Sequence, residues 1–301
     1  MYDVMILGSG PAGLSAAVYA SRAGLSFAVI EKDYMGTGQI VYTEQVDNYL
    51  GYCGIDGFSL GEKFREHAEA LGTEFIEGEV TELSRTDSGW KILLSDGNIT
   101  ESKTVIYALG ASPRKLGITG EEEFAGRGVS YCALCDGAFF EGKTVSVIGG
   151  GDTALGDALY LSKTSEKVYI IHRRSEFRAS ASLVKKAEKT ANIEFILEAV
   201  PSEITGADSV TGIKLNQKGA EKNLSTDGVF VAVGSLPNTA LLSGTAELDD
   251  RGYVIADESC ITSAEGLFAA GDVRTKAVRQ VITAAADGAN ALVSALNCIN
   301  K

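Results

Sequence analysis

The feature that most restricts the fold is a glycine-rich turn between two short apolar runs. Residues 4–7 are apolar, residues 8–13 read GSGPAG and open a helical pattern, and the apolar run 27–30 stops at Glu31. Glycines at this spacing let a backbone approach a pyrophosphate at the N-terminus of a helix, and an acid after the second strand accepts hydrogen bonds from ribose hydroxyls. The segment therefore predicts a strand–helix–strand unit that binds a dinucleotide, the alternative being a glycine turn without a ligand.

The same unit occurs a second time in the chain. The apolar run 144–148 leads into GGGDTA at residues 149–154, a helical pattern follows, and the apolar run 168–171 ends at His172. When the two units are aligned, His172 falls on Glu31 and the small residues of the turns coincide, Gly149, Gly151 and Ala154 with Gly8, Gly10 and Gly13. This repeat predicts two nucleotide-binding units in one chain.

The two units differ at the position that selects the ligand. Where the first unit ends in an acid, the second ends in His172, Arg173 and Arg174, with Arg178 one turn further on. A carboxylate would repel a 2′-phosphate, whereas guanidinium groups bind phosphate oxygens through charge-assisted hydrogen bonds. The first site therefore favours an adenosine without a 2′-phosphate and the second favours NADPH. The alternative is that the three arginines form a solvated face.

Between the two turns lies a cysteine pair, Cys132 and Cys135, with Asp136 directly after it. A C-x-x-C pair closes a disulfide within one turn or supplies half of a zinc site. Zinc needs two more ligands at matching spacing, and neither His67 nor His172 lies in such a pair. The pattern therefore favours a cycling dithiol. Proton transfer to the thiols needs a nearby acid, and Asp136 is the candidate, with a helix cap as its alternative role.

Composition and cysteine usage predict a cytoplasmic protein. Cys53, Cys260 and Cys298 stand alone, and we expect them to be isolated thiols packed as small hydrophobes. Five cysteines without an even framework indicate a reducing compartment. The N-terminus has no basic segment, and no apolar run approaches the ~18 residues of a membrane helix, so we expect no membrane association. The net charge of -13 argues against binding to nucleic acid.

The pattern of strands between the two turns predicts a β-meander. Residues 79–83, 90–94 and 98–101 are predicted to form its strands, with Asp96-Gly97 at a turn, and a separate core strand follows over residues 104–108. At 301 residues the chain is long enough for two domains.

Two short segments predict the crossings between these domains. Small residues at positions 110–113 and the break at residues 235–238 each interrupt the apolar pattern. Beyond the second break, the apolar run 266–271 delivers Asp272 at its end. An acid at a strand end in an open α/β sheet points into the ligand crevice, although it can also be a plain helix cap.

Five motifs occur in an order that resembles the low-molecular-weight thioredoxin reductases. They are GSGPAG at 8–13, CALCDG at 132–137, GGGDTA at 149–154, HRR with an arginine at 172–178, and GD with RQ between 271 and 280. The resemblance implies an α/β fold of two Rossmann-like nucleotide-binding domains of the three-layer ββα type. The FAD-binding domain would be discontinuous, formed by residues 1–112 and 245–301, and the NADPH-binding domain, residues 113–244, would be inserted and carry the dithiol.

The resemblance also implies an activity, the NADPH-dependent reduction of thioredoxin through FAD and the dithiol. Cys135 would face the flavin, Cys132 would attack the partner disulfide, and Asp136 would donate or accept a proton. FAD would be held by Gly8, Gly10, Pro11, Ala12, Gly13, Glu31, Lys32, Gln39, Asn48, Val80, Gly110, Asp272, Arg279, Gln280 and Val281. NADPH would be held by Gly150, Gly151, Asp152, Thr153, His172, Arg173, Arg174 and Arg178. Members of the family are commonly homodimers.

Three other functions fit parts of the pattern. One is the branch of the family that takes electrons from ferredoxin and has lost NADPH binding, and the arginines near His172 argue against it. The others are a reductase for another small dithiol carrier and a flavin-binding redox sensor without turnover. The chain departs from the usual family pattern at Leu50, Val278 and Gly156. A glycine inside the predicted helix, as at Gly156, costs about 1 kcal/mol relative to alanine.

Overall fold

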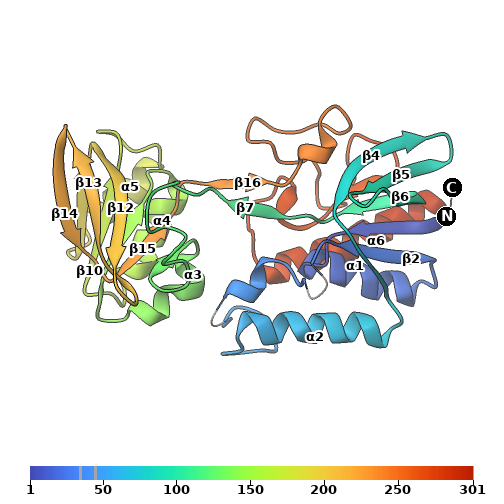
Figure 1. The fold of residues 1–301 in the computed structure, drawn as a ribbon, viewed down its shortest axis with the longest axis horizontal. Helices are drawn as coiled ribbons and strands as arrows, with labels where there is room; N and C mark the ends of the chain where they lie inside the picture. Colours follow the sequence, from blue (N-terminus) through green and yellow to red (C-terminus); the bar gives the residue numbers. More distant parts are fainter. Residues whose placement is uncertain (34–35, 44–45, 301) are drawn as a thin grey trace. The chain divides into compact units, whose positions relative to one another are not determined.

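The structure is a computed structural model that describes residues 1–33, 36–43 and 46–300. The chain forms two compact units, Met1–Ser112 with Leu236–Lys301 and Pro113–Ser235 (Figure 1). It leaves the first unit along β7 (Ala111–Pro113) and returns along β16 (Ser235–Pro237), and these two strands pair with each other. The first unit is therefore discontinuous in sequence, and the second is inserted into it.

The chain returns to the first unit earlier than the sequence indicates. The boundary lies between residues 235 and 236, not between 244 and 245. The reason is η3 (Ala240–Leu242), in which Leu242 is fully buried in the first unit's core beside Val254 and Leu267. A pair of leucines among polar residues is too short an apolar run to mark a core element in the sequence.

The sheet of the first unit has the order β3-β2-β1-β6-β5-β4, with β17 also pairing to β6. Five strands pair in parallel: β1 (Tyr2–Leu7), β2 (Phe27–Glu31), β3 (Glu74–Glu77), the second half of β6 (Ile99–Tyr107) and β17 (Leu267–Ala269). A parallel strand covered on both faces is apolar at every position, and residues 4–7 of β1 are wholly buried. This burial explains the uninterrupted apolar run before the first glycine turn.

Strand β6 replaces two strands that the sequence predicts separately. Its first half continues the antiparallel meander of β4 (Val80–Thr86) and β5 (Gly89–Leu94), and its second half pairs with β1. Ser102 lies at the junction, where it is opposite Trp90 on one side and Tyr2 on the other. Because the first half is polar after Ile99 and the second half is apolar, the sequence pattern changes inside a strand whose backbone is continuous.

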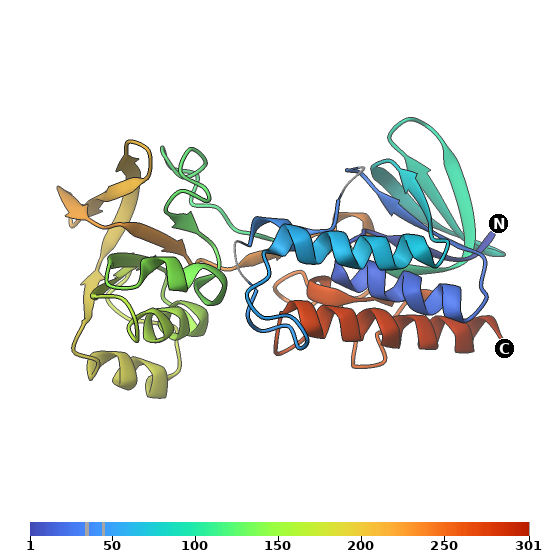
Figure 2. The same ribbon diagram turned by 90° about the horizontal axis from the view of Figure 1, so that it is seen from below.

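Helices α1 (Pro11–Arg22), α2 (Gly57–Ala70) and α6 (Val281–Ile299) lie side by side on one face of this sheet (Figure 2). The backbones of α1 and α6 are in direct contact. A Cβ atom added to Gly288 would lie 2.0 Å from the carbonyl oxygen of Ala12 and 2.9 Å from the amide nitrogen of Ala16. Only glycine at position 288 permits this approach.

By length and composition α6 is apolar enough to cross a membrane, with a mean hydropathy of 1.2. The prediction that no apolar run approaches this length therefore does not hold for α6. A core helix of a soluble protein has the same properties. In this fold one stripe of α6, which includes Ala291, Leu292 and Ala295, is buried in the core that it shares with α1.

The second unit has a parallel sheet of order β11-β10-β9-β15-β8. Its strands are β8 (Val129–Ser130), β9 (Thr144–Ile148), β10 (Lys167–His172), β11 (Ile193–Leu197) and β15 (Gly228–Val231). Its helices are α3 (Ala133–Asp136), η2 (Gly137–Phe140), α4 (Asp152–Leu161) and α5 (Ala181–Glu188). A separate antiparallel sheet is formed by β12 (Ala199–Gly206), β13 (Val210–Gln217) and β14 (Ala220–Ser225).

The second unit has three layers, with a hydrophobic core on each face of its parallel sheet. Val145 and Val147 of β9 pack with Leu155 of α4 on one face of the parallel sheet. On the other face, Ile148 packs with Ile213 of the antiparallel sheet. Successive strand residues point to opposite faces, so alternating apolar side chains fill both cores. The predicted α/β class with two Rossmann-like units is confirmed.

Two glycines inside helices should respond in opposite directions to alanine. Gly156 in α4 has no heavy atom of the described residues within 4 Å of an added Cβ, so Gly156→Ala should raise the free energy of unfolding by about 1 kcal/mol. Gly288→Ala gains the same helix propensity but drives a methyl group into the backbone of α1, and it should lower that free energy. Urea unfolding of both variants measures the difference. Equal stabilisation by both changes would contradict the contact between α1 and α6.

Candidate active site and nucleotide sites

The first glycine turn is shaped by two close backbone approaches. Gly8 has φ +97°, and its amide donates to the carbonyl of Ile30 at 2.8 Å. A Cβ atom on Gly13 would lie 1.8 Å from the carbonyl oxygen of Gly8, so α1 begins directly against the turn. The N-cap Gly10 offers no side chain to the first amides of α1. These amides are therefore oriented to receive an anionic ligand.

Glu31 is held beside this turn. One carboxylate oxygen accepts hydrogen bonds from the amide and the hydroxyl of Ser9, at 2.9 and 2.8 Å. The other accepts from the amides of Lys32 and Asp33, at 2.9 and 3.3 Å. The acid that sequence reasoning assigns to ribose recognition is thus fixed by the turn, and Ser9 is a partner that the motif did not identify.

Side-chain contacts join distant parts of the first unit, two of them at the residues that precede α6. The amide of Asn48 donates to the side-chain oxygen of Gln280 at 2.9 Å. The side chain of Gln39 donates to the carbonyl of Ala111. The Arg279 guanidinium lies 4.1 Å from the centre of the Tyr253 ring. In two of these three pairs the partners lie more than 70 positions apart in the sequence, and the fold brings them together.

Asp272 and Arg279 each present a buried polar atom that has no hydrogen-bond partner among the described residues, Oδ1 of Asp272 and Nε of Arg279. Burial raises the pKa of Asp272, and the charges of Lys276 and Arg279 oppose this rise. A buried acceptor and a buried donor without partners are unusual in a protein interior. They fit a polar ligand such as FAD, which offers hydroxyl and ring nitrogen groups.

The turn that carries Asp272 is tied to α6 by a buried ion cluster. Asp287 of α6 accepts hydrogen bonds at 2.9 Å from the amide of Gly271, from Nε of Arg274 and from Nζ of Lys276, and at 2.6 Å from Nη2 of Arg274. Burial alone would raise the pKa of Asp287, but the bonds from Arg274 and Lys276 outweigh it and lower that pKa. The cluster therefore keeps the carboxylate charged and fixes the position of Asp272.

The remaining residues predicted for FAD also lie in the first unit. They are Gly10, Pro11 and Ala12 at the start of α1, Lys32 after β2, Val80 at the start of β4, Gly110 before β7 with φ +64°, and Val281 at the start of α6.

The second glycine turn repeats the geometry of the first. The amide of Gly149 donates to the carbonyl of Ile171 at 3.1 Å, as Gly8 does to Ile30. A Cβ atom on Gly150 would lie 2.2 Å from the His172 ring, so the turn packs against the residue that replaces Glu31. A Cβ atom on Gly151 would instead meet open space, with no heavy atom of the described residues within 4 Å.

Asp152 and Thr153 begin α4 beside that space. Asp152 accepts from the amide of Ser180 at 2.7 Å, which links α4 to the start of α5.

Next to this turn is a pocket lined by Arg173, Arg174, Ser175, Glu176, Phe177, Arg178 and Glu198. His172 contacts two of these lining residues, because its Nε2 lies 3.1 Å from the carbonyl oxygen of Glu176 and its ring stacks on Phe177 at 5.3 Å. Burial lowers the pKa of His172, and the three arginines lower it further. The three guanidinium groups therefore share one pocket, as phosphate recognition requires.

Cys132 and Cys135 form a disulfide, with their Cα atoms 5.3 Å apart. Cys132 caps the short helix α3, and the Cys135 amide lies 3.2 Å from the Cys132 sulfur. Asp136 ends α3, where its Oδ2 accepts a hydrogen bond from the Ser130 hydroxyl at 2.5 Å. The predicted pairing is thus observed, and Ser130 is a further neighbour that no spacing indicated.

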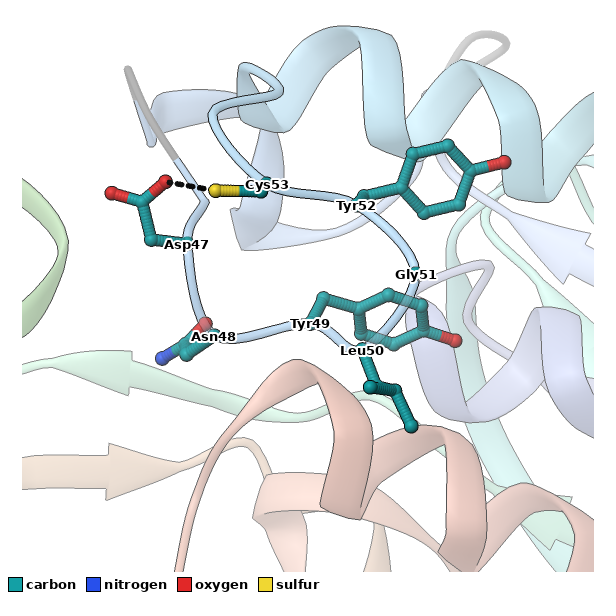
Figure 3. Close-up of a pocket in the computed structure, with 7 residues that line it drawn as sticks. All are labelled: Asp47, Asn48, Tyr49, Leu50, Gly51, Tyr52 and Cys53. Atoms are coloured by element: carbon teal, nitrogen blue, oxygen red, sulfur yellow. Dashed lines mark hydrogen bonds between the residues drawn. The ribbon is translucent and has the colours of Figure 1, made fainter.

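A second pocket lies in the first unit, over the loop that contains Asn48. It is lined by Asp47, Asn48, Tyr49, Leu50, Gly51, Tyr52 and Cys53 (Figure 3). The Cys53 sulfur lies 3.8 Å from Oδ1 of Asp47, and Cys53 is exposed. The prediction that all three single cysteines pack as small hydrophobes is therefore wrong for Cys53, because its loop leaves it facing solvent. Cys260 is buried and Cys298 is half-buried.

Comparison with known proteins agrees with this geometry. A family model described as pyridine nucleotide-disulphide oxidoreductase matches residues 2–288. The chain is 43% identical to a thioredoxin reductase of Listeria monocytogenes over 291 residues, which cover 96% of this chain and 91% of that one. It is 39% identical to a thioredoxin reductase of Bacillus subtilis over 311 residues, 100% of this chain and 96% of that one.

Solved structures include a thioredoxin reductase of Streptococcus pyogenes with a TM-score of 0.90 and 40% identity, over 100% of this chain and 98% of that one. The predicted resemblance is confirmed, as is the prediction that the chain is an oxidoreductase. With a redox disulfide and two glycine turns of the same build, the chain belongs to the pyridine nucleotide-disulphide oxidoreductase family.

Proposed function

We propose that this protein is an NADPH-dependent flavoprotein that reduces the disulfide of thioredoxin through Cys132 and Cys135. One observation carries the proposal: the Cys132–Cys135 disulfide lies in the same unit as a pocket that holds three arginines. The relatives named thioredoxin reductase match this chain over nearly its full length, which supports thioredoxin as the partner.

We assign FAD to the unit formed by residues 1–112 and 236–301, and NADPH to the unit formed by residues 113–235. The support for the first assignment is Glu31 beside the first turn and the partnerless polar atoms of Asp272 and Arg279. The support for the second is the arginine pocket beside the second turn. When bound, FAD accepts two electrons as hydride from NADPH and passes them to the disulfide.

The protein's own residues then carry out the thiol–disulfide exchange and the proton transfers. Reduction of the disulfide consumes two electrons and two protons and leaves two thiols. Cys132 attacks the partner disulfide, Cys135 resolves the mixed disulfide, and the partner leaves as a dithiol. Asp136, at the end of α3, exchanges a proton with the thiols during this cycle. We further propose that the protein acts in the cytoplasm as a homodimer, as the family resemblance implies.

Alanine substitutions at two equivalent glycines should distinguish the FAD site from the NADPH site. A Cβ atom on Gly10 makes only an ordinary contact, 3.7 Å from Gly38, and one on Gly151 meets open space, so Gly10→Ala and Gly151→Ala should both fold. In each case the methyl group occupies the cradle of one pyrophosphate. Gly10→Ala should weaken FAD binding tenfold or more, about 1.4 kcal/mol, while Gly151→Ala should retain FAD and raise the KM for NADPH.

Titration of apoprotein with FAD and steady-state kinetics of the reconstituted enzyme measure both effects. Unchanged FAD affinity in Gly10→Ala, or loss of FAD from Gly151→Ala, would contradict the assignment of the two units.

Donor preference should depend on the arginine pocket. Each charge-assisted hydrogen bond to a 2′-phosphate contributes ~1.5–3 kcal/mol, so two such contacts favour NADPH over NADH by roughly 10²–10⁴-fold in kcat/KM. Replacing Arg173 and Arg178 by Ala should raise the KM for NADPH and leave turnover with NADH nearly unchanged.

The double variant Lys185→Ala/Lys222→Ala removes the same charge from exposed positions of this unit and serves as the control. It should keep the preference for NADPH. Slow, equal reduction of the unmodified protein by both nucleotides, with fast reduction by ferredoxin, would instead support the ferredoxin-linked branch.

The cysteines should differ in reactivity according to their pairing and exposure. Alkylation of denatured protein should label three thiols before reduction and five after it, because only Cys132 and Cys135 are paired. In the native oxidised protein Cys53 should react first, since it is exposed. Cys260 should stay unreactive through pH 10, because burial raises its pKa to about 12 and keeps the thiol protonated. Mass spectrometry of labelled peptides measures each site, and early labelling of Cys260 would be incompatible with its burial.

A further inference from the structure

Ser130 is a buried residue that connects the two parts of the dithiol site. It is the last residue of β8, and only 5% of its surface is exposed. Its hydroxyl lies 2.5 Å from Oδ2 of Asp136, 3.1 Å from the amide nitrogen of Cys132 and 3.3 Å from the carbonyl oxygen of Cys132. One hydroxyl group therefore contacts both the acid and the backbone of a redox cysteine.

The hydrogen-bonding capacity of a serine matches this arrangement in either protonation state of the acid. A hydroxyl has one proton to donate and two lone pairs that accept. With Asp136 ionised, the Ser130 proton points to its carboxylate and the Cys132 amide donates to the Ser130 oxygen. With Asp136 protonated, the acid donates to the second lone pair of Ser130, whose own proton turns to the carbonyl oxygen of Cys132.

We propose that Ser130 is a positioning residue that holds the Asp136 carboxyl in one place before and after it transfers a proton. The inference rests on the proposed role of Asp136. In the step concerned, the O–H bond of the Asp136 acid breaks, an S–H bond forms on a thiolate of the dithiol, and a carboxylate remains. Ser130 keeps its own proton and only rotates it, from the Cys132 carbonyl to Asp136.

The effect of removing the hydroxyl has a definite direction. A hydrogen bond to a charged carboxylate is about twice as strong as one between neutral groups. Loss of the Ser130 donor therefore destabilises the ionised acid more than the protonated one. The pH midpoint of any step that depends on Asp136 should move upward, on the order of one pH unit.

Other titratable groups surround α3 and are unchanged in the variants below. On α4, which packs against α3, they are Asp157 and Tyr160, and burial raises the pKa of Asp157 to about 7. Glu141 follows η2. Tyr131 precedes Cys132 and donates to Glu121 at 3.0 Å. Because each variant carries all of these groups, their titration cancels when midpoints are compared.

The experiment uses FAD-loaded protein, reduced with NADPH and mixed in a single turnover with a small aromatic disulfide across pH 5–9. Valine and threonine side chains have nearly the same shape, so Ser130→Val and Ser130→Thr differ from each other only in the hydroxyl group. Ser146→Ala is the matched control, because Ser146 is a fully buried serine of the same sheet whose hydroxyl bonds Thr226 at 3.1 Å. Asp136→Asn tests the role of the acid itself.

We expect the midpoint to rise by about one pH unit in Ser130→Val, to stay at the unmodified value in Ser130→Thr and Ser146→Ala, and to disappear in Asp136→Asn. If Ser130→Val loses rate equally at all pH values and its midpoint does not move, the substitution has caused only a structural change. This result overturns the inference about Ser130 and leaves the role of Asp136 intact. A midpoint that persists in Asp136→Asn removes the proposed proton role of Asp136, and the inference about Ser130 with it.

Discussion

The carboxylate of Asp287 is the constraint on which the flavin side of the molecule depends. It is almost completely buried, and it accepts hydrogen bonds from the backbone of Gly271 and from the side chains of Arg274 and Lys276. Breaking a buried ion pair by removing one partner costs about 3–5 kcal/mol, since a charge is left without compensation. The position of Asp272, one residue after Gly271, thus depends on a residue of another element, and α6 acts both as core helix and as support for the site.

The two glycine turns show how one backbone design serves two ligands. In each, the first glycine bonds to the second strand of its unit, and the last residue of that strand lies against the turn. In the first unit that residue is an acid bonded to Ser9. In the second it is His172, packed against Gly150 and stacked on Phe177. The backbone geometry is therefore common to both units, and the choice of ligand depends on the side chains at the end of the second strand and just after it.

Local patterns predicted those parts of the fold that depend on neighbouring residues. The glycine turns, the buried parallel strands and the pairing of Cys132 with Cys135 all follow from short spacings. The continuity of β6 was not predicted, because its polarity changes where it moves from a meander to a buried sheet. The exposure of Cys53 depends on a loop conformation that no periodicity encodes.

The residues that support the sites were harder to predict, because they belong to no sequence motif. Asp287 is visible in the sequence as the only charged residue in the apolar sequence of α6, but it belongs to none of the five motifs. Ser130 has no such signal, since its partners Cys132 and Asp136 meet it only after β8 and α3 have folded. The cysteine pair identifies the chemistry from sequence alone. The residues that orient the site can be recognised only from their contacts in the folded structure.

The pairing of β7 with β16 also determines how the second unit is joined to the first along the chain. Gly110 accepts a hydrogen bond from the amide of Asn238 at 3.0 Å, and Gly234 accepts one from the amide of Arg114 at 2.9 Å. The outgoing and returning segments are thus neighbours along their whole length. The two ends of the first unit therefore lie next to each other, so a direct link between residues 112 and 236 would close this unit without cutting any other connection of its sheet.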